Sequence, residues 1–383
     1  MKIKIGLFFG GKSTEHEVSI ITALQAYNAF NKDKYEVVPI YITKENQFFT
    51  SEHIGRIEEY SNIPALLKKS KQVILIADNL YEFTGKKISK KPLFEINIAF
   101  LAVHGTNVED GALQGFMQTM GIPYTGCDVT SSAIGMDKSA TKAVLKQAGI
   151  PVLDCFTITA KEFSAGYSLP DTMSYPVIVK PLNLGSSIGI KKADNPEELT
   201  GALEHAFLFA NRVIIEPAIV NLKEVNCSVL GDIDHAEASE CEEPIASGTI
   251  LDFDDKYSGG GKNNKNTGMA SLKRKIPAGI SAQQREEIRD LSVKAFQALG
   301  CSGVARIDFL LDTESGKTYF NEINTIPGSL AFYLWEPVGV TYPELLDRMV
   351  QLSLKRERDL KNLNFTFENN ILSNFKGGMK GSK

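Results

Sequence analysis

The chain has 383 residues, of which 43% are hydrophobic and 23% are charged, and its formal net charge is -4. This length predicts two or three domains, each large enough to bury its own core. The composition is typical of a soluble globular protein, and the net charge gives no reason to expect nucleic acid as a partner.

Membrane spans and disulfides are not expected either. No apolar run approaches the length that crosses a bilayer, and no signal-like segment opens the chain. The five cysteines are scattered singly without a CxxC pair, which indicates reduced thiols rather than disulfides or a zinc site. These features predict a cytoplasmic protein.

The first segment alternates predicted strands and helices. Apolar runs predict strands at residues 2–9, 35–43 and 96–103. The capping box Thr14-x-x-Glu17 opens one helix, and the stretch from Gly111 to Met120 forms another. Strands separated by helices predict a parallel sheet with helices on its faces, in a domain of the α/β class.

Residues 6–13 fit the pattern G-x-x-x-x-G-K-[ST] of a phosphate-binding P-loop. In a true P-loop the variable positions form a loop whose amides wrap phosphate, whereas here residues 7–9 continue the strand and are expected to be buried. We therefore reject the P-loop. On local grounds alone, Glu15 serves helix capping and the helix dipole, and His16 is a surface histidine.

A glycine-rich segment, His104-Gly-x-x-x-Glu109-Asp-Gly111, closes the last of these strands. Ligands of α/β sheets bind at the C-terminal ends of strands, so this segment and Glu15 are candidates to line one pocket. A tight glycine-rich turn is the alternative.

A candidate phosphate-binding loop lies in the middle of the chain. The strand at residues 176–181 carries Lys180 at its end and leads into Gly185-Ser186-Ser-Ile-Gly189. Small residues let backbone amides approach a polyphosphate, and the lysine supplies a point charge. Serine-rich turns are also frequent in plain hairpins.

Two strands joined by a short glycine-containing turn are predicted at residues 304–311 and 318–324. The period of two places Arg306 and Asp308 on one face of the first strand, and Glu322 and Asn324 on one face of the second. Oxygen ligands of this kind favour magnesium that shares its shell with nucleotide phosphates. An antiparallel hairpin with a polar solvent face fits the same alternation.

The remaining segments are a loop, two helices and a tail. Residues 250–276 are rich in Gly, Asn and Lys without periodicity, which is typical of a functional lid or of disorder. A long helix is predicted from Ser281 to Gly300, and the capping box Thr341-x-x-Glu344 opens the last one. Residues 366–383 are expected to be a disordered tail.

Taken together, the motifs resemble those of the ATP-grasp superfamily and, within it, the D-alanine:D-alanine ligases. The resemblance covers nearly all of residues 1–352, and its most specific motifs lie at residues 10–19, 104–111, 136–138, 179–189, 306–308 and 321–328. It implies a three-domain α/β and α+β fold. The domains are a Rossmann-like domain at 1–126, a central ATP-grasp subdomain at 127–217 and a C-terminal subdomain at 218–365 that carries the metal site and the lid.

The resemblance also implies a reaction and its ligands. ATP would drive ligation of two D-alanines to D-alanyl-D-alanine through an acyl phosphate, for peptidoglycan synthesis, in a cytoplasmic homodimer that needs two Mg²⁺ or Mn²⁺ ions. The implied ATP contacts are Lys138 and Lys180 at the phosphates, Glu216 at the adenine, Glu224 at the ribose, and Lys256 on the lid. The implied metal ligands are Asp308, Glu322 and Asn324.

Substrate and catalytic contacts follow from the same resemblance. Glu15 would bind the ammonium of the first D-alanine, with His104 close to it, and Tyr257 on the lid would link to Ser186 and Glu15. Arg306 and the Gly328 amide would stabilise the oxyanion.

The sequence departs from the family after Gly328, where a serine usually grips the second substrate's carboxylate. Tyr333 stands near the expected place, and Ser329 is the other candidate. The pair Lys256-Tyr257 favours an amine nucleophile, since relatives that use D-lactate lack that tyrosine. D-Lactate or D-serine as second substrate, and a nucleotide-binding protein without ligase activity, are the alternatives.

Overall fold

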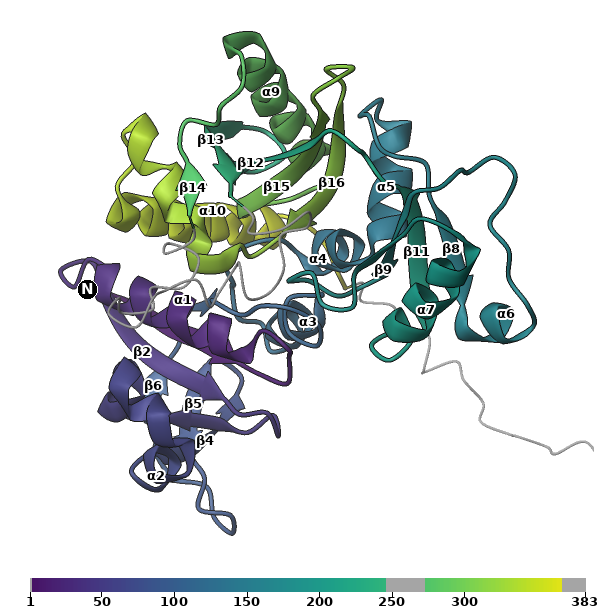
Figure 1. The fold of residues 1–383 in the computed structure, drawn as a ribbon. Coiled ribbons are helices and arrows are strands. Elements are labelled where there is room, and N and C mark those ends of the chain that lie inside the picture. Colours follow the sequence, from purple (N-terminus) through teal and green to yellow (C-terminus); the bar gives the residue numbers. More distant parts are fainter. Residues whose placement is uncertain (1, 246–272, 367–383) are drawn as a thin grey trace, which may run out of the picture.

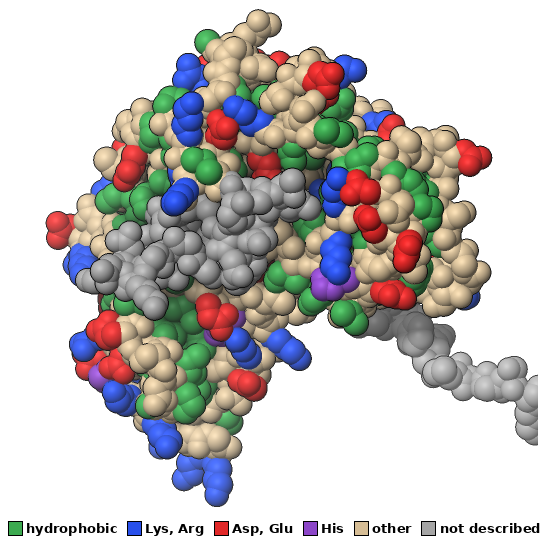
Figure 2. Space-filling view, in the orientation of Figure 1, with side chains coloured by type: hydrophobic (Ala, Val, Ile, Leu, Met, Phe, Trp, Pro, Cys, Tyr) green, Lys and Arg blue, Asp and Glu red, His purple; other side chains and the backbone are tan. Residues whose placement is uncertain are grey.

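The structure, a computed structural model, describes residues 2–245 and 273–366 (Figure 1). In these residues the strands form three sheets, of seven, four and five strands. On the face shown in Figure 2, acidic and basic side chains are interspersed over most of the surface. In the described part of the chain no helix is both long enough and apolar enough to span a bilayer.

The N-terminal sheet has the strand order β6-β5-β4-β3-β2-β1-β7. Its strands are β1 (Ile3–Gly10), β2 (Tyr35–Ile42), β3 (Phe48–Thr50), β4 (Lys71–Ile76), β5 (Asn79–Glu82), β6 (Phe94–Glu95) and β7 (Ile98–Leu101). β1 pairs in parallel with β2 and β7, whereas β2 to β6 pair antiparallel. The α/β class is therefore confirmed, with a parallel part of three strands. Within the antiparallel part, short turns join β2 to β3 and β4 to β5, because parallel pairing of consecutive strands needs a longer crossover connection.

The helical elements of this region are α1 (His16–Ala29), the 3-10 helices Glu52–Gly55 and Ile57–Asn62, α2 (Ile63–Lys68) and α3 (Ala112–Thr119). The capping box predicted at Thr14 and Glu17 is wrong. Instead α1 begins at His16 with Glu15 as its N-cap residue, and the Glu15 side chain makes no capping bond.

The central sheet has the order β10-β9-β11-β8 and is antiparallel. Its strands are β8 (Phe156–Thr159), β9 (Val177–Pro181), β10 (Lys191–Ala193) and β11 (Arg212–Pro217). The helices around it are α4 (Val129–Met136), α5 (Lys138–Gln147), α6 (Ala160–Ser164) and α7 (Pro196–Ala206). The start of α7 is capped by Asn195, whose side chain accepts the Glu198 N–H at 3.0 Å, and Pro196 occupies the first turn.

The C-terminal sheet has the order β14-β13-β12-β15-β16. Its strands are β12 (Leu222–Gly231), β13 (Ala236–Pro244), β14 (Arg274–Lys275), β15 (Gly303–Asp312) and β16 (Thr318–Asn324). The helical elements are α9 (Ala282–Ala298), the 3-10 helices η4 (Gly328–Leu334) and η5 (Glu336–Val338), and α10 (Tyr342–Lys361). α9 packs on β13 and β12, and α10 lies between this sheet and the N-terminal one, in contact with β15, β7 and α1 (Figure 1).

Two further helix starts were predicted, one at Ser281 and one at the capping box of Thr341 and Glu344. At α9 a capping box forms, since Ser281 accepts the Gln284 N–H and the Gln284 side chain accepts the Ser281 N–H. At α10 Thr341 is the N-cap residue, but its side chain makes no capping bond. The predicted tail, apart from residue 366, lies outside the described residues.

Candidate active site

The predicted hairpin is present, and its register brings the polar side chains together. In the pairing of β15 with β16, Asp308 is opposite Glu322 and Arg306 is opposite Asn324. Asp308 also pairs with Asn226 of β12 on its other side. The four predicted residues therefore share one end of the C-terminal sheet.

Arg306 and Asp308 form a bidentate ion pair. Both hydrogen bonds, from Nε to Oδ1 and from Nη2 to Oδ2, are 2.7 Å long, and both residues are buried. Burial alone would lower the pKa of Arg306, but the adjacent Asp308 carboxylate holds it well above the usual value. Asn324 Nδ2 donates to Asp308 Oδ2 at 3.2 Å. This ion pair thus joins Arg306, which was predicted to stabilise the oxyanion, to Asp308, which was predicted to bind metal.

The residues at this end of the hairpin suit a hard divalent cation. Asp308 and Glu322 supply carboxylate oxygens, and Asn324 supplies an amide. Within residues 2–245 and 273–366, no group of three or more His, Cys, Asp or Glu side chains is arranged to hold a metal. A donor set of two carboxylates and an amide fits magnesium, which keeps part of its shell for water and phosphate.

A buried carboxylate with two lysines lies beside the hairpin. Lys180 Nζ is 2.9 Å from Glu216 Oε2 and donates to Asn321 Oδ1 at 2.9 Å, and Lys142 forms an ion pair with Glu216 Oε1. Burial would raise the pKa of Glu216, but the charges of Lys180 and Lys142 lower it to about 2. Glu216, predicted at the adenine, therefore directs its carboxylate at these two lysines.

Lys142 was missed in the sequence. It follows Lys138 by four positions on α5, so both lie on one helix face. Lys138 Nζ donates to the Leu184 carbonyl at 2.6 Å and lies 3.6 Å from Glu322 Oε2. The predicted phosphate lysine thereby connects α5, the glycine–serine loop and the hairpin.

Glu224, predicted at the ribose, lies half-buried on β12. Burial lowers the pKa of Lys180, but the carboxylates of Glu216, Glu322 and Glu224 outweigh burial and raise it. Glu224 therefore acts electrostatically on the same lysine as Glu322.

The carboxylate of Glu15 is enclosed by loops from two sheets. Ser186 Oγ donates to Glu15 Oε1. A β-carbon would lie 3.0 Å from Glu15 Oε2 at Gly185 and 2.8 Å from it at Gly105, so glycine allows both loops to approach this closely. Glu15 and Ser186 are thus in direct contact, and the predicted link of both to Tyr257 stays a prediction. Lys256 and Tyr257, with most of the predicted lid, lie outside the described residues.

His104 is buried, and both its ring nitrogens contact protein atoms. Nδ1 is 2.8 Å from the Ile326 carbonyl, so it carries the hydrogen, and Nε2 accepts from Thr22 Oγ1 at 2.8 Å. Thr22 Oγ1 in turn accepts the Ser329 N–H at 2.9 Å. Burial lowers the pKa of His104 to about 4, so the ring is neutral near pH 7. His104, which was predicted to lie near the first substrate, therefore also positions the segment around Gly328.

Glu109 is a second buried group whose role the sequence did not show. Its Oε1 accepts the Ile326 N–H at 2.9 Å and the Thr325 hydroxyl at 3.2 Å, while Oε2 accepts the Gly105 N–H at 2.9 Å. Burial, followed by the charge of Glu15, raises the pKa of Glu109 to about 7.

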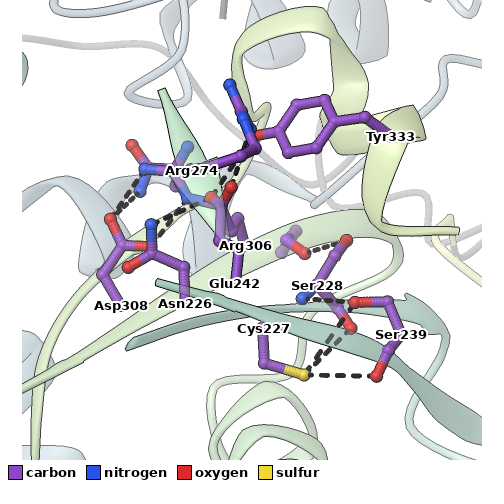
Figure 3. A network of polar contacts seen from close by, with 11 residues as sticks. Asn226, Cys227, Ser228, Ser239, Glu242, Arg274, Arg306, Asp308 and Tyr333 are labelled. Atoms are coloured by element: carbon purple, nitrogen blue, oxygen red, sulfur yellow. Dashed lines mark hydrogen bonds and ion pairs between the residues drawn. The ribbon is translucent and has the colours of Figure 1, made fainter. Parts of the chain in front are cut away.

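The two candidates for the second carboxylate differ in their surroundings. Ser329 Oγ is buried and makes no hydrogen bond with the described residues, and the backbone at residues 329–331 is left-handed, with φ values of 55°, 51° and 50°. Such backbone in non-glycine residues is typical of functional sites. Tyr333 is half-buried, and its hydroxyl donates to Glu242 Oε1 at 3.4 Å beside Arg274 and Arg306 (Figure 3).

The rejection of the P-loop is supported, because Leu7, Phe8 and Phe9 are fully buried strand residues and Lys12 is exposed. The interpretation of His16 as a surface residue is wrong. Its ring is fully buried, with Nδ1 2.6 Å from the Gly11 carbonyl and Nε2 2.9 Å from the Tyr41 hydroxyl. Long-range contacts with β2 thus decide its environment.

Comparisons with known proteins point to one family along most of the chain. The family model described as D-ala D-ala ligase N-terminus matches residues 4–127, and the D-ala D-ala ligase C-terminus model matches residues 144–351. A D-alanine--D-alanine ligase from Thermosipho melanesiensis is 39% identical, over 94% of this chain and 96% of its own length. One from Chlorobium phaeovibrioides is also 39% identical, over 94% and 99%.

Solved structures show the same likeness. The D-alanine-D-alanine ligase from Coxiella burnetii superposes with a TM-score of 0.77 at 29% identity, covering 94% of this chain and 98% of that one. The VanG D-Ala:D-Ser ligase from Enterococcus faecalis superposes with a TM-score of 0.74 at 31% identity, covering 92% and 100%.

Proposed function

Because the chain belongs to the D-alanine–D-alanine ligase family, we propose that it uses ATP to join two D-alanines into D-alanyl-D-alanine at the site described above. It is an ATP-dependent ligase, and peptidoglycan synthesis is the role of its family. The observation that carries the site assignment is the convergence of Lys138 and Lys180 on the β15–β16 hairpin, where Lys138 lies 3.6 Å from the Glu322 carboxylate and Lys180 donates to the Asn321 side chain. We place the protein in the cytoplasm, as a homodimer.

In the first step the carboxylate of one D-alanine attacks the γ-phosphorus of ATP, the bond to ADP breaks, and an acyl phosphate forms. Lys138 and Lys180 neutralise charge on the phosphates, and Glu15 holds the substrate ammonium while Ser186 fixes the Glu15 carboxylate. Catalysis of this step is mainly positioning and charge neutralisation. Asp308, Glu322 and Asn324 would hold two Mg²⁺ or Mn²⁺ ions, which supply positive charge to the transferring phosphate.

In the second step the neutral amine of the second D-alanine attacks the acyl carbon. The tetrahedral centre collapses, phosphate leaves, and the nitrogen loses its proton as the amide forms. Arg306 and the Gly328 N–H stabilise the oxyanion, and donors held in place before the reaction are the effective ones. Asp308 fixes the Arg306 guanidinium through two hydrogen bonds, and His104 and Thr22 fix the segment around Gly328.

Further residues are assigned to the nucleotide and to the second carboxylate. Glu216 and Glu224 line the nucleotide side next to Lys180, and the family resemblance assigns Lys256 to ATP and Tyr257 to Glu15 and Ser186. Ser329 and Tyr333 are the candidates for the second carboxylate.

Purified protein with ATP, Mg²⁺ and D-alanine tests the proposal. We expect ADP, phosphate and dipeptide in equal amounts, and no dipeptide with L-alanine. Turnover with another amino or hydroxy acid but none with D-alanine would reject the substrate assignment. ATP binding without turnover of any acceptor would favour a nucleotide-binding protein without ligase activity.

D-Serine as second substrate is a competing assignment, which the structural likeness to the D-Ala:D-Ser ligase VanG favours. In a competition between D-alanine, D-serine and D-lactate, the ratio of the two dipeptides compares D-alanine with D-serine. The change in product ratios from pH 6 to 9 separates both amines from D-lactate. An amine nucleophile must lose its proton, so its share of product rises with pH, whereas the hydroxyl of D-lactate carries no such requirement.

A further inference from the structure

A cluster of three side chains lies next to Arg306, and only one of them, Tyr333, has been given a candidate role so far. It joins Arg274 of β14, Glu242 of β13 and Tyr333 of η4 (Figure 3). The guanidinium carbon of Arg274 lies 3.8 Å from the centre of the Tyr333 ring, and Arg274 Nη1 is 2.7 Å from Glu242 Oε2. The cluster therefore presents a cation stacked on a phenol.

The position of this cluster relative to the oxyanion donors suggests its ligand. The amine nitrogen and the carboxyl carbon of an amino acid are separated by one carbon, a distance of about 2.5 Å. When the amine of the second D-alanine bonds to the acyl carbon held by Arg306, its carboxylate must therefore lie close to Arg306. Arg274 and Tyr333 are a cation and a hydroxyl donor at that place (Figure 3).

The hydrogen bonds within the cluster are consistent with an incoming anion. The Tyr333 hydroxyl lies 3.4 Å from Glu242 Oε1, and O–H···O bonds usually measure about 2.7–2.8 Å. This long bond leaves the phenol proton able to turn to a better acceptor. Glu242 keeps other donors, because Asn226 Nδ2 donates to its Oε1 at 3.1 Å and Arg274 Nη1 donates to its Oε2 at 2.7 Å.

We propose that Arg274 is a specificity-determining residue that, with Tyr333, binds the carboxylate of the second amino acid. Tyr333 donates its phenolic hydrogen, and Arg274 supplies the positive charge over the ring, which also strengthens the phenol as a donor. Glu242 is a positioning residue that holds Arg274 in this orientation. The inference rests on the proposed function and deepens it, since it assigns the acceptor site of the same reaction.

An acceptor that lacks the carboxylate provides the test. D-Alaninamide has the nucleophilic amine but cannot be phosphorylated as the first substrate, so it competes only for the second position. Wild-type protein with ATP, Mg²⁺ and equal D-alanine and D-alaninamide should form mainly D-alanyl-D-alanine rather than its amide. The product ratio is internal to each sample and does not depend on the fraction of active protein.

We expect Arg274→Gln to lower this product ratio about 10- to 100-fold, the equivalent of a hydrogen bond to a charged group. Tyr333→Phe, which keeps the ring for stacking, should lower the ratio in the same direction by a smaller factor. Arg274→Lys keeps the charge without the planar fork and should fall between wild type and Arg274→Gln.

An unchanged ratio in both Arg274→Gln and Tyr333→Phe overturns the inference and leaves a structural ion pair between β13 and β14. If Arg274→Gln yields no soluble protein, the ratio in Tyr333→Phe decides. Failure of the proposed function looks different, because the wild-type protein would then release no ADP in response to D-alanine. Ligase activity in the wild-type protein, together with unchanged product ratios in the variants, therefore contradicts only the assignment of the second carboxylate to Arg274 and Tyr333.

Discussion

Glu109 accepts the backbone N–H of Ile326, while the neighbouring His104 donates to the carbonyl of the same residue. Two buried side chains of the loop after β7 thus hold both polar backbone groups of Ile326, which lies two residues before Gly328. The N-terminal sheet thereby positions the segment to which we assign an oxyanion donor. This contact crosses more than 200 positions of sequence and lies between two different sheets.

The Glu109 contact predicts a pH-dependent stability. Burial raises the pKa of Glu109 to about 7, above the 4.5 of an unperturbed glutamate. The folded state therefore favours the protonated form, and the resulting stability is fully present below pH 4.5 and lost as the pH rises through 7. For a shift of this size the loss is at most about 3 kcal/mol.

Glu109→Gln removes this titration. The unfolding free energy of wild type minus that of the variant should fall by up to about 3 kcal/mol between pH 4.5 and 8, measured by urea denaturation. Glu17→Gln, on the exposed side of α1, is a control for general charge effects. A difference that stays constant across this pH range contradicts the raised pKa.

Thr22 predicts a second effect on the same segment. Its hydroxyl accepts the Ser329 N–H and donates to His104 Nε2, so Thr22→Val leaves both buried groups unsatisfied at a cost of about 1–3 kcal/mol each. We expect lower unfolding free energy and a lower kcat, because the oxyanion segment shifts. Thr22→Ser keeps the hydroxyl and should retain most of both. A loss in Thr22→Ser without one in Thr22→Val, which keeps the methyl group, would mean that the methyl group, not the hydroxyl, matters.

The parts of the site that follow a local period were predictable, and those that depend on which loops meet were not. The β15–β16 hairpin and its paired side chains follow from the period of two along each strand. Thr22, Lys142 and Glu109 have no local signal beyond a helix face or a glycine-rich motif. Their roles arise from contacts between segments far apart in sequence, which a single sequence does not reveal.

Glu15 shows why a local rule failed. Thr14 and Glu17 have the spacing of a capping box, yet α1 starts two residues later with Glu15 in the N-cap position. The Glu15 carboxylate makes no capping bond and instead accepts from Ser186 of the central region. Replacement of a local capping bond by a long-range contact is expected at a functional site.

Lys180 predicts how nucleotide binding is lost. Lys180→Met should raise the KM for ATP about 10- to 100-fold, because a charge-assisted contact to phosphate disappears. Lys12→Ala should change it little, since Lys12 is exposed and belongs to no phosphate loop. Steady-state kinetics and equilibrium nucleotide binding check both.

Lys142→Met is the matched comparison for Lys180→Met, because each variant removes one of the two cations that neutralise Glu216. If the KM for ATP rises equally in both, the effect of Lys180 runs through Glu216 rather than through phosphate. A strong effect of Lys12→Ala would revive the P-loop interpretation.

Asp308 and Glu322 should respond differently to loss of charge, although both are assigned to the metal. Asp308 holds the buried Arg306 with two hydrogen bonds, so Asp308→Asn leaves an uncompensated guanidinium and should lower the unfolding free energy without metal by about 3–5 kcal/mol.

Glu322 is more exposed, with 19% of its side chain accessible, and lies 3.6 Å from Lys138. Glu322→Gln should therefore be nearly as stable as wild type but need more Mg²⁺ for half-maximal activity. Urea denaturation in EDTA and Mg²⁺ titrations of activity separate the two effects. An unchanged Mg²⁺ requirement in Glu322→Gln would remove Glu322 from the metal site, because loss of a ligand's negative charge should weaken the binding of a divalent cation.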